Sequence, residues 1–219
     1  MVLLTAHFDA WDPAQGANDN GAEVATVLEA ARILKLLKIR PRHTIRFVFF
    51  SGEEQSDLGS RAYVAQHKQE LDKIRAVFNT DAGVQPPLGF KLYGRTDLAA
   101  NTQKLISPLA PLGVDRVFTD ADFDSDEESF MVVGVPAYSL AVEPQDYYAR
   151  HHTIIDTLER IDPRMLSLHT AVLATVAYSF ANADERPGRR LTSPEVKDLL
   201  RRTGLETLFE LDYPDGKPY

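Results

Sequence analysis

Histidines and carboxylates that are suited to bind metal ions occur at several separate points of this 219-residue chain. Near the N-terminus, His7 and Asp9 are two residues apart, so their side chains point to the same side of an extended strand. Further on, the adjacent acids Glu53 and Glu54 repel each other unless a cation neutralises one of them. The chain has no cysteine. Imidazole and carboxylate ligands without a thiolate are more typical of a catalytic zinc site than of a structural one.

Other candidates have an ordinary explanation when each is taken alone. Asp19 lies in a turn rich in Asn, Asp and Gly, where an aspartate commonly caps the following helix. Asp81 follows an apolar run, and the adjacent histidines His151 and His152 follow another one. A solvated acid or a surface histidine is the simplest interpretation of any one of them. Their combined position after successive apolar runs favours a shared metal site.

The hydrophobic pattern predicts the elements that must position these residues. Apolar and β-branched runs predict strands at Val2–Ala6, Thr44–Phe50, Ile74–Thr80, Phe90–Tyr93, Arg116–Thr119 and Ala137–Ala141. Helical periodicity predicts helices at Gly21–Leu37, Leu58–Leu71, Asp97–Leu109, Glu127–Val133 and Pro163–Ala183. Alternating strands and helices predict an α/β fold with three layers, α/β/α, around a mostly parallel sheet. Ligands of such sheets bind at the carboxyl ends of the strands.

Chain organisation predicts one main domain over residues 1–185 and a C-terminal part over 186–219. The polar run 184–190 reads as a linker, a short helix begins at Ser193 and ends before Gly204, and we expect a loose tail over Asp212–Tyr219. The first strand begins at the first residues of the chain. We therefore expect that N-terminal strands which would cover the sheet edge are missing, and that the chain is able to form a homodimer through that edge.

Composition narrows the classes of partner. The formal net charge is −8, which disfavours binding to nucleic acid or to an anionic membrane surface because phosphates are repelled. No run reaches the ~20 apolar residues that a membrane-spanning helix needs. Acidic residues at this density are compatible with a protein that holds cations.

Five runs in order, HFDAWDPAQGANDNGAE, FSGEEQSDLGS, NTDAG, SDEESF and HHTIIDT, resemble the M28 family of co-catalytic zinc peptidases. The resemblance covers about residues 2–183. The Asp-Ala-Trp run after His7 and the doubled histidine are most similar to the carboxypeptidase Q branch of that family. The resemblance implies the zinc exopeptidase-like fold, with a mixed central sheet, and it implies two zinc ions per chain.

The resemblance also implies a role for each matching residue. His7 and Asp81 would bind one zinc ion, Glu54 and His152 the other, and Asp19 would bridge both. Glu53 would be the general base. Asp9 would orient His7 as an outer carboxylate, and Asp126 matches the Ser-Asp motif near the site. Many relatives have a tyrosine before the last histidine ligand, where it helps to hold the oxyanion; His151 occupies that position here and is expected to act in its place.

The implied function is that of a two-zinc exopeptidase or dipeptidase. It would hydrolyse peptide bonds near a free terminus of a peptide or dipeptide substrate through a metal-bound hydroxide, with Glu53 taking the proton. Two alternatives stay open, namely a single-zinc acyl transferase like the glutaminyl cyclases and a non-catalytic binding module with a peptidase fold. The resemblance implies that the full-length protein is exported to a periplasmic or extracellular location.

Overall fold

Strand β1 (Val2–His7) is buried along its whole length and ends at His7, as expected for a strand with a neighbour on each side. The computed structural model describes residues 1–12, 14–123, 125–144 and 147–218. Strand β1 pairs in parallel with β2 (Ile45–Phe50) on one side and with β3 (Ala76–Asn79) on the other. The apolar runs that predicted these three strands therefore fold next to one another.

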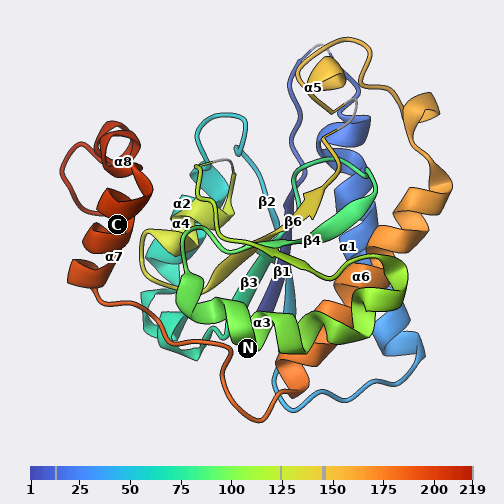
Figure 1. The fold of residues 1–219 in the computed structure, drawn as a ribbon. Helices are drawn as coiled ribbons and strands as arrows, with labels where there is room; N and C mark the ends of the chain where they lie inside the picture. The colour runs from blue at the N-terminus through green and yellow to red at the C-terminus, as the bar shows by residue number, and fades with distance from the viewer. Residues whose placement is uncertain (13, 124, 145–146, 219) are drawn as a thin grey trace.

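The sheet has six strands in the order β2-β1-β3-β6-β4-β5. Strand β6 (Ala137–Val142) continues the parallel set beside β3. Strand β4 (Pro87–Lys91) runs antiparallel to β6 and parallel to β5 (Arg116–Phe118). The prediction of a mostly parallel, mixed sheet in an α/β fold is confirmed (Figure 1).

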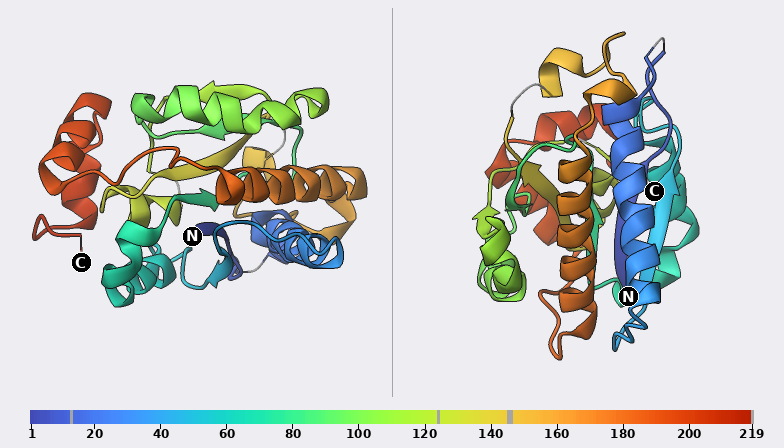
Figure 2. Two further views of the ribbon diagram at one scale, coloured as in Figure 1. Left: turned by 90° about the horizontal axis from the view of Figure 1, so that it is seen from below. Right: turned by 90° about the vertical axis from the view of Figure 1, so that its right-hand side faces the viewer.

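Helices cover both faces of this sheet. The helices α1 (Ala22–Leu36), α3 (Ala99–Ile106) and α6 (Pro163–Asn182) run side by side on one face, with α6 in contact with both others (Figure 2). On the other face lie α2 (Leu58–Gln66) and α4 (Glu127–Met131), which contact each other. The molecule thus has the predicted three layers.

Side chains alternate between the two faces of the sheet, so there are two hydrophobic cores, one on each face. On β1, Val2, Leu4 and Ala6 belong to the cluster under α1, α3 and α6, whereas Leu3 belongs to the cluster under α2 and α4. Successive side chains of a strand point to opposite faces, so Thr5 and His7 lie on the same face as Leu3. The side chains that precede the site are therefore directed toward the α2/α4 layer.

Two predicted helices are interrupted. The helix expected over Leu58–Leu71 ends at Gln66, and a 3-10 segment, η2, covers Lys68–Lys73. The helix expected over Asp97–Leu109 is three pieces, η3 (Thr96–Leu98), α3 and η4 (Ser107–Leu112). Two prolines in η4 lack the amide hydrogen that an α-helix requires, which explains why the α-helical part stops at Ile106.

Three further elements were not expected. A π-type turn, η1 (Ala17–Gly21), precedes α1, and the short helix α5 (Tyr147–Arg150) and the 3-10 turn η5 (Leu158–Arg160) precede α6. The strand predicted at Phe90–Tyr93 is shifted to Pro87–Lys91, and Tyr93 has a left-handed backbone with φ 50°.

The C-terminal part contains two helices, α7 (Ser193–Thr203) and α8 (Glu206–Asp212). Only α7 was predicted, and the expectation of a loose tail is wrong for Tyr213, which is 6% exposed in the second core; Tyr219 lies outside the described residues. The red helices of Figure 1 lie beside α2 and α4. Within the described residues, no helix is both long and apolar enough to cross a membrane.

Candidate metal centre

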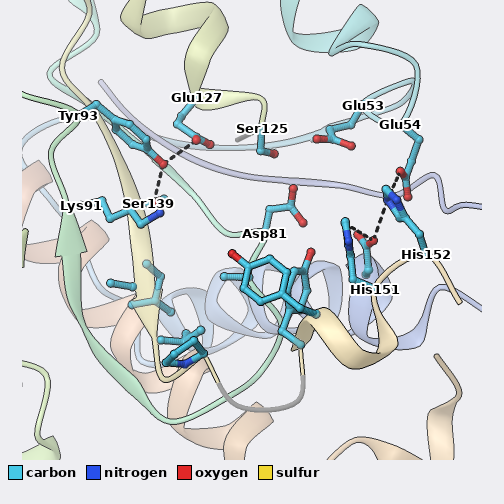
Figure 3. Close-up of a pocket in the computed structure, with 18 residues that line it drawn as sticks. Glu53, Glu54, Asp81, Lys91, Tyr93, Ser125, Glu127, Ser139, His151 and His152 are labelled. Carbon is cyan, nitrogen blue, oxygen red and sulfur yellow. Dashed lines mark hydrogen bonds and ion pairs between the residues drawn. The ribbon is translucent and has the colours of Figure 1, made fainter. Parts of the chain in front are cut away.

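The candidate site lies at the carboxyl edge of the parallel strands. His7 ends β1, Glu53 and Glu54 follow β2, and Asp81 follows β3. The parallel register places His7 opposite Phe50 and Thr5 opposite Asn79, so the residues just beyond each strand emerge at the same edge. Figure 3 shows the carboxylates and histidines turned toward one cavity.

Asp19 joins the two sides of this cluster. Its Oδ1 lies 3.2 Å from Nε2 of His7, and its Oδ2 lies 3.5 Å from Nε2 of both His151 and His152. The backbone N–H groups of Asn18 and Asp19 donate to the two carboxylate oxygens of Asp156 at 2.7 and 3.0 Å. Asp156 lies in the run HHTIIDT, yet nothing in the sequence indicated that it anchors the turn η1.

One side of the cluster is formed by His7, which is fully buried. Its Nε2 lies 3.2 Å from Oδ1 of Asp81 and 3.8 Å from Oε2 of Glu53. Asp81 is held from behind by Glu23 of α1, which accepts hydrogen bonds from the Thr80 hydroxyl and from the backbone N–H groups of Ala82 and Gly83. A helix on one face of the sheet thereby fixes the loop that carries Asp81.

The other side is formed by His152 and Glu54. Nε2 of His152 lies 2.8 Å from Oε2 of Glu54. His152 has a left-handed backbone with φ 57°, a conformation that a non-glycine residue adopts only when its surroundings hold it there. Here the ring of Trp11 stacks on it with centroids 5.0 Å apart, and the ring of His151 stacks at 3.6 Å.

Asp9 contacts both the histidine and the acidic pair. The carbonyl oxygen of Asp9 lies 3.2 Å from Nδ1 of His7, and its carboxylate lies 3.6 Å from the same nitrogen. The carboxylate also accepts hydrogen bonds from the backbone N–H groups of Glu53 and Glu54 at 3.4 and 3.3 Å. The side chain predicted to orient His7 therefore also holds the loop after β2.

Asp126 is buried at the start of α4 and is not among the described residues that line the cavity. Burial raises the pKa of its carboxyl to about 8, while the Ser60 hydroxyl opposes the shift. Its neighbours Ser125 and Glu127 do line the cavity, although neither was predicted. The predicted role of Asp126 near the metal ions stays a prediction.

Burial and the clustered charges shift the pKa values of the site. Burial raises the pKa of Glu53 to about 10, and nearby Asp81 adds to the shift. Burial alone would lower the pKa of His7, but hydrogen bonds to Asp19 and Asp81 raise it to about 12. Burial, and then the charge of Asp19, raise the pKa of Glu54. A cation between these groups would remove the repulsion among the carboxylates.

The donor set fits divalent metal ions. Ligand atoms come within 4.8 Å of one another in three overlapping groups, which are His7 with Glu53 and Asp81, His7 with Asp19 and Glu54, and Asp19 with His151 and His152. In addition, Oε1 of Glu54 is buried without a hydrogen-bond partner among the described residues. Buried polar atoms normally have a partner, and a metal ion would supply it. Every predicted ligand belongs to at least one group, together with Glu53 and His151.

A cavity of about 480 Å³ opens from this cluster along the sheet. Its far walls are formed by residues that the sequence analysis did not single out, among them Lys91, Tyr93, Ser125, Glu127, Ser139 and Tyr147. Their separation along the chain gave no local signal. The cavity is within the ~300–1,000 Å³ range of small-molecule sites.

The chain belongs to peptidase family M28, whose model matches residues 1–177. It is 35% identical over 185 residues to carboxypeptidase Q of Rattus norvegicus, which covers 84% of this chain and 39% of that relative. The chain thus spans about two fifths of the length of the curated relatives it matches.

Solved structures share the fold. A peptidase M28 precursor from Shewanella amazonensis superposes with a TM-score of 0.81 at 33% identity, covering 87% of this chain and 43% of that one. A zinc aminopeptidase from Bacillus subtilis superposes with a TM-score of 0.68 at 24% identity, covering 88% of this chain and 49% of that one, and this likeness concerns the fold alone. Family membership and fold are therefore established independently of the site geometry.

Proposed function

We propose that this chain is the catalytic part of a zinc exopeptidase that binds two zinc ions and hydrolyses peptide bonds near a free terminus. Membership of peptidase family M28 supports the reaction class. The carboxylate and imidazole groups at the cavity support the assignment of zinc, because histidines and carboxylates without thiolates are typical ligands of catalytic zinc. The substrate would occupy the cavity that continues from the cluster.

The observation that carries this proposal is the geometry of Asp19. Its two carboxylate oxygens face different histidine and carboxylate groups, His7 with Asp81 on one side and His152 with Glu54 on the other. In the proposed arrangement, His7 and Asp81 would hold one ion, His152 and Glu54 would hold the second, and Asp19 would contribute to both. The two hydrogen bonds that the backbone of η1 donates to the Asp156 carboxylate fix the position of Asp19 in the cluster.

Zinc ions held there would polarise the peptide carbonyl and lower the pKa of a bound water molecule toward ~7. Proton transfer is assigned to Glu53, which lines the cavity beside the proposed ligands. Its carboxylate accepts a proton from water and delivers it to the departing amine. In the absence of cations the pKa of Glu53 is raised to about 10 by burial and by Asp81. A cation bound beside Glu53 would remove the repulsion from Asp81 and offset the burial, so it would favour the charged form that a base requires.

The test of this proposal is the substitution Glu53→Gln in the chain as it exists. We expect the variant to retain two zinc ions per chain by elemental analysis and to lose at least about 100-fold in kcat on dipeptide substrates. Glu210→Gln, which removes an exposed acid of α8, is the matched control and should leave both quantities unchanged.

Three outcomes would contradict the proposal. Full activity of Glu53→Gln would exclude Glu53 as the base. Loss of zinc with that substitution would make Glu53 a ligand, which the group containing His7, Glu53 and Asp81 also allows geometrically. One zinc ion per wild-type chain would favour the single-zinc acyl transferase instead. That alternative is not favoured, since the chain and its more similar relatives share the peptidase family.

A further inference from the structure

The exposed ring of Trp11 has no part in the proposed reaction, although it lies against a proposed zinc ligand. Trp11 is the only tryptophan of the chain, and it is 44% exposed. Large aromatic side chains are on average well buried, because their burial removes much apolar surface from water. The Trp11 indole instead stacks on the imidazole of His152. This position favours a role of Trp11 at the metal centre.

The imidazole of His152 is the most exposed of the groups assigned to the metal ions. Its side chain is 37% exposed, whereas the side chains of the other four proposed ligands are at most 9% exposed. Close packing restricts the rotamers of those four side chains. A partly exposed side chain exchanges between rotamers unless specific contacts prevent it. His152 therefore needs a support that the core does not supply.

The backbone of His152 also depends on its surroundings. Its φ of 57° lies in the left-handed region, which a non-glycine residue rarely adopts. The turn around it is closed by two short-range hydrogen bonds, from the N–H of Thr153 to the carbonyl oxygen of Arg150 at 2.9 Å and from the N–H of Asp156 to that of Thr153 at 3.1 Å. These bonds fix the backbone and leave the orientation of the imidazole to side-chain contacts.

Two rings enclose that imidazole. The His151 ring stacks on it with centroids 3.6 Å apart and planes 25° apart, and the Trp11 indole stacks on it at 5.0 Å and 27°. Nε2 of the enclosed ring lies 2.8 Å from Oε2 of Glu54. Rotation of His152 away from Glu54 would break the contacts with both rings. The stack therefore selects the rotamer that faces the proposed zinc position.

The loop that carries Trp11 is hydrogen-bonded to the loop that carries His152. The backbone N–H of Gln15 donates to the carbonyl oxygen of Asp156 at 3.3 Å, and the side-chain oxygen of Gln15 accepts from the backbone N–H of Leu158 at 3.1 Å. These two bonds keep the loops side by side, although they are far apart in the sequence. The indole is thereby held against the imidazole from outside the turn.

A bound cation would strengthen the contact between the indole and the imidazole. An imidazole that coordinates zinc carries more positive charge than a free one, and the face of an indole is negative. A ring that is already oriented also loses less side-chain entropy when the ion binds. Contacts to metal ligands from outside the ligand set commonly change metal affinity by about 10- to 100-fold.

We propose that Trp11 is a positioning residue of the metal centre, whose indole holds the His152 imidazole in its zinc-binding orientation and raises the affinity for one of the two ions. This inference rests on the proposed function, because it takes His152 as a zinc ligand. The affected ion is the one assigned to His152 and Glu54. Trp11 acts on metal binding and leaves the chemical step to other groups.

The first test measures zinc affinity by competition with a chelator. We expect Trp11→Ala to bind one ion as wild type does and the other roughly 3- to 30-fold more weakly, the worth of a contact between a cation and an aromatic face. Trp11→Phe should keep part of the affinity. Phe8→Ala removes a 61% exposed aromatic residue of the same loop and should change neither ion. Unchanged affinities in Trp11→Ala overturn the proposal, and so does equal weakening of both ions.

The zinc dependence of turnover separates positioning from contact with the substrate. Trp11→Ala is assayed on dipeptides at limiting and at saturating zinc. We expect activity to fall at limiting zinc, whereas kcat and KM at saturating zinc return to within about 2-fold of wild type. A KM that stays raised at saturating zinc would make Trp11 a substrate contact and overturn the positioning role.

The fluorescence of Trp11 keeps this inference distinct from the proposed reaction. Because the chain has no other tryptophan, its emission reports on this stack alone. During a zinc titration of the wild-type chain, we expect the emission to change with the weaker or the stronger ion, but not with both. Emission that is indifferent to both ions overturns the inference. A selective change in a chain without peptidase activity would refute only the proposed reaction, and a chain that binds no zinc would refute both.

Discussion

At the scale of single residues, the adjacent histidines His151 and His152 have different contacts. His152 contacts Glu54 at 2.8 Å, whereas His151 lies against Asp19 at 3.5 Å and against the ring of Tyr147. His151 also lines the cavity, so a substrate carbonyl at the metal centre would lie within its reach. We therefore predict that His152 is a metal ligand and that His151 is an oxyanion donor.

The substitution His151→Phe tests this separation of roles. We expect kcat on dipeptides to fall by about 100-fold while zinc content and KM change little, because a lost oxyanion donor affects the transition state alone. Steady-state kinetics and elemental analysis measure these quantities, with His43→Phe as the control outside the site. Unchanged turnover would remove His151 from the mechanism, and a loss of zinc would make it a ligand.

At the scale of elements, a partly buried ionic cluster joins three helices behind the loop that carries Glu53 and Glu54. The guanidinium of Arg61 on α2 lies 3.6 Å from Asp57 and Glu128 and 3.7 Å from Asp212 at the end of α8. The same group lies over the ring of Tyr213 at 4.8 Å from its centroid. Because Asp57 is three residues beyond Glu54, the C-terminal helices are fastened to the segment that carries the acidic pair.

The carboxyl of Glu128 makes this cluster sensitive to pH. Burial raises its pKa from 4.5 to about 8, with Asp57 and Asp212 adding to the shift. The folded state thus binds this proton more tightly than the unfolded state does. The contribution to the free energy of unfolding is complete below about pH 4.5 and is lost as the pH rises through about 8.

We predict that Glu128→Gln, which stays neutral at every pH, becomes progressively more stable relative to wild type between pH 5 and pH 8.5. The gain over this range is on the order of a few kcal/mol, since one unit of pKa shift corresponds to about 1.4 kcal/mol. Urea denaturation at pH 5, 6.5 and 8.5 measures it, and Glu210→Gln controls for the loss of one acid. A stability difference that does not vary with pH would show that Glu128 is charged throughout.

At the scale of the whole molecule, the C-terminal helices share a core with the central sheet. Leu199 and Leu200 of α7 belong to the same cluster as Leu3 of β1 and Val77 of β3. The formal net charge is −8, and the carboxylates of the candidate metal centre contribute to it. We infer that α7 and the sheet unfold together.

Leu199→Ala tests this inference. Leu199 is 1% exposed, and the substitution should lower the free energy of unfolding by about 2–5 kcal/mol in a single transition. Differential scanning calorimetry and urea denaturation measure both the size and the number of transitions. Leu211→Ala, at a leucine that is 73% exposed, should change stability by less than about 0.5 kcal/mol. Two separate transitions in the wild type would contradict a shared cooperative unit.

The sequence by itself determined which candidate metal-binding residues follow which strands. His7, Glu54 and Asp81 each stand just beyond an apolar run, and local periodicity is encoded in neighbouring residues, so these positions were predictable. The same reasoning gave three layers and a mostly parallel sheet. It mispredicted the lengths of α2 and α3, where backbone breaks and prolines compete with periodicity.

Only the tertiary structure decided which distant residues share the cavity. The antiparallel course of β4 brings Lys91 beside Ser139, and the fold brings Asp156 to the backbone of Asp19. Strand order and register depend on the packing of side chains that are far apart in the chain, which no local pattern records. The candidate metal ligands were therefore recognisable in the sequence, whereas the opposite wall of the cavity became visible only when the sheet was assembled.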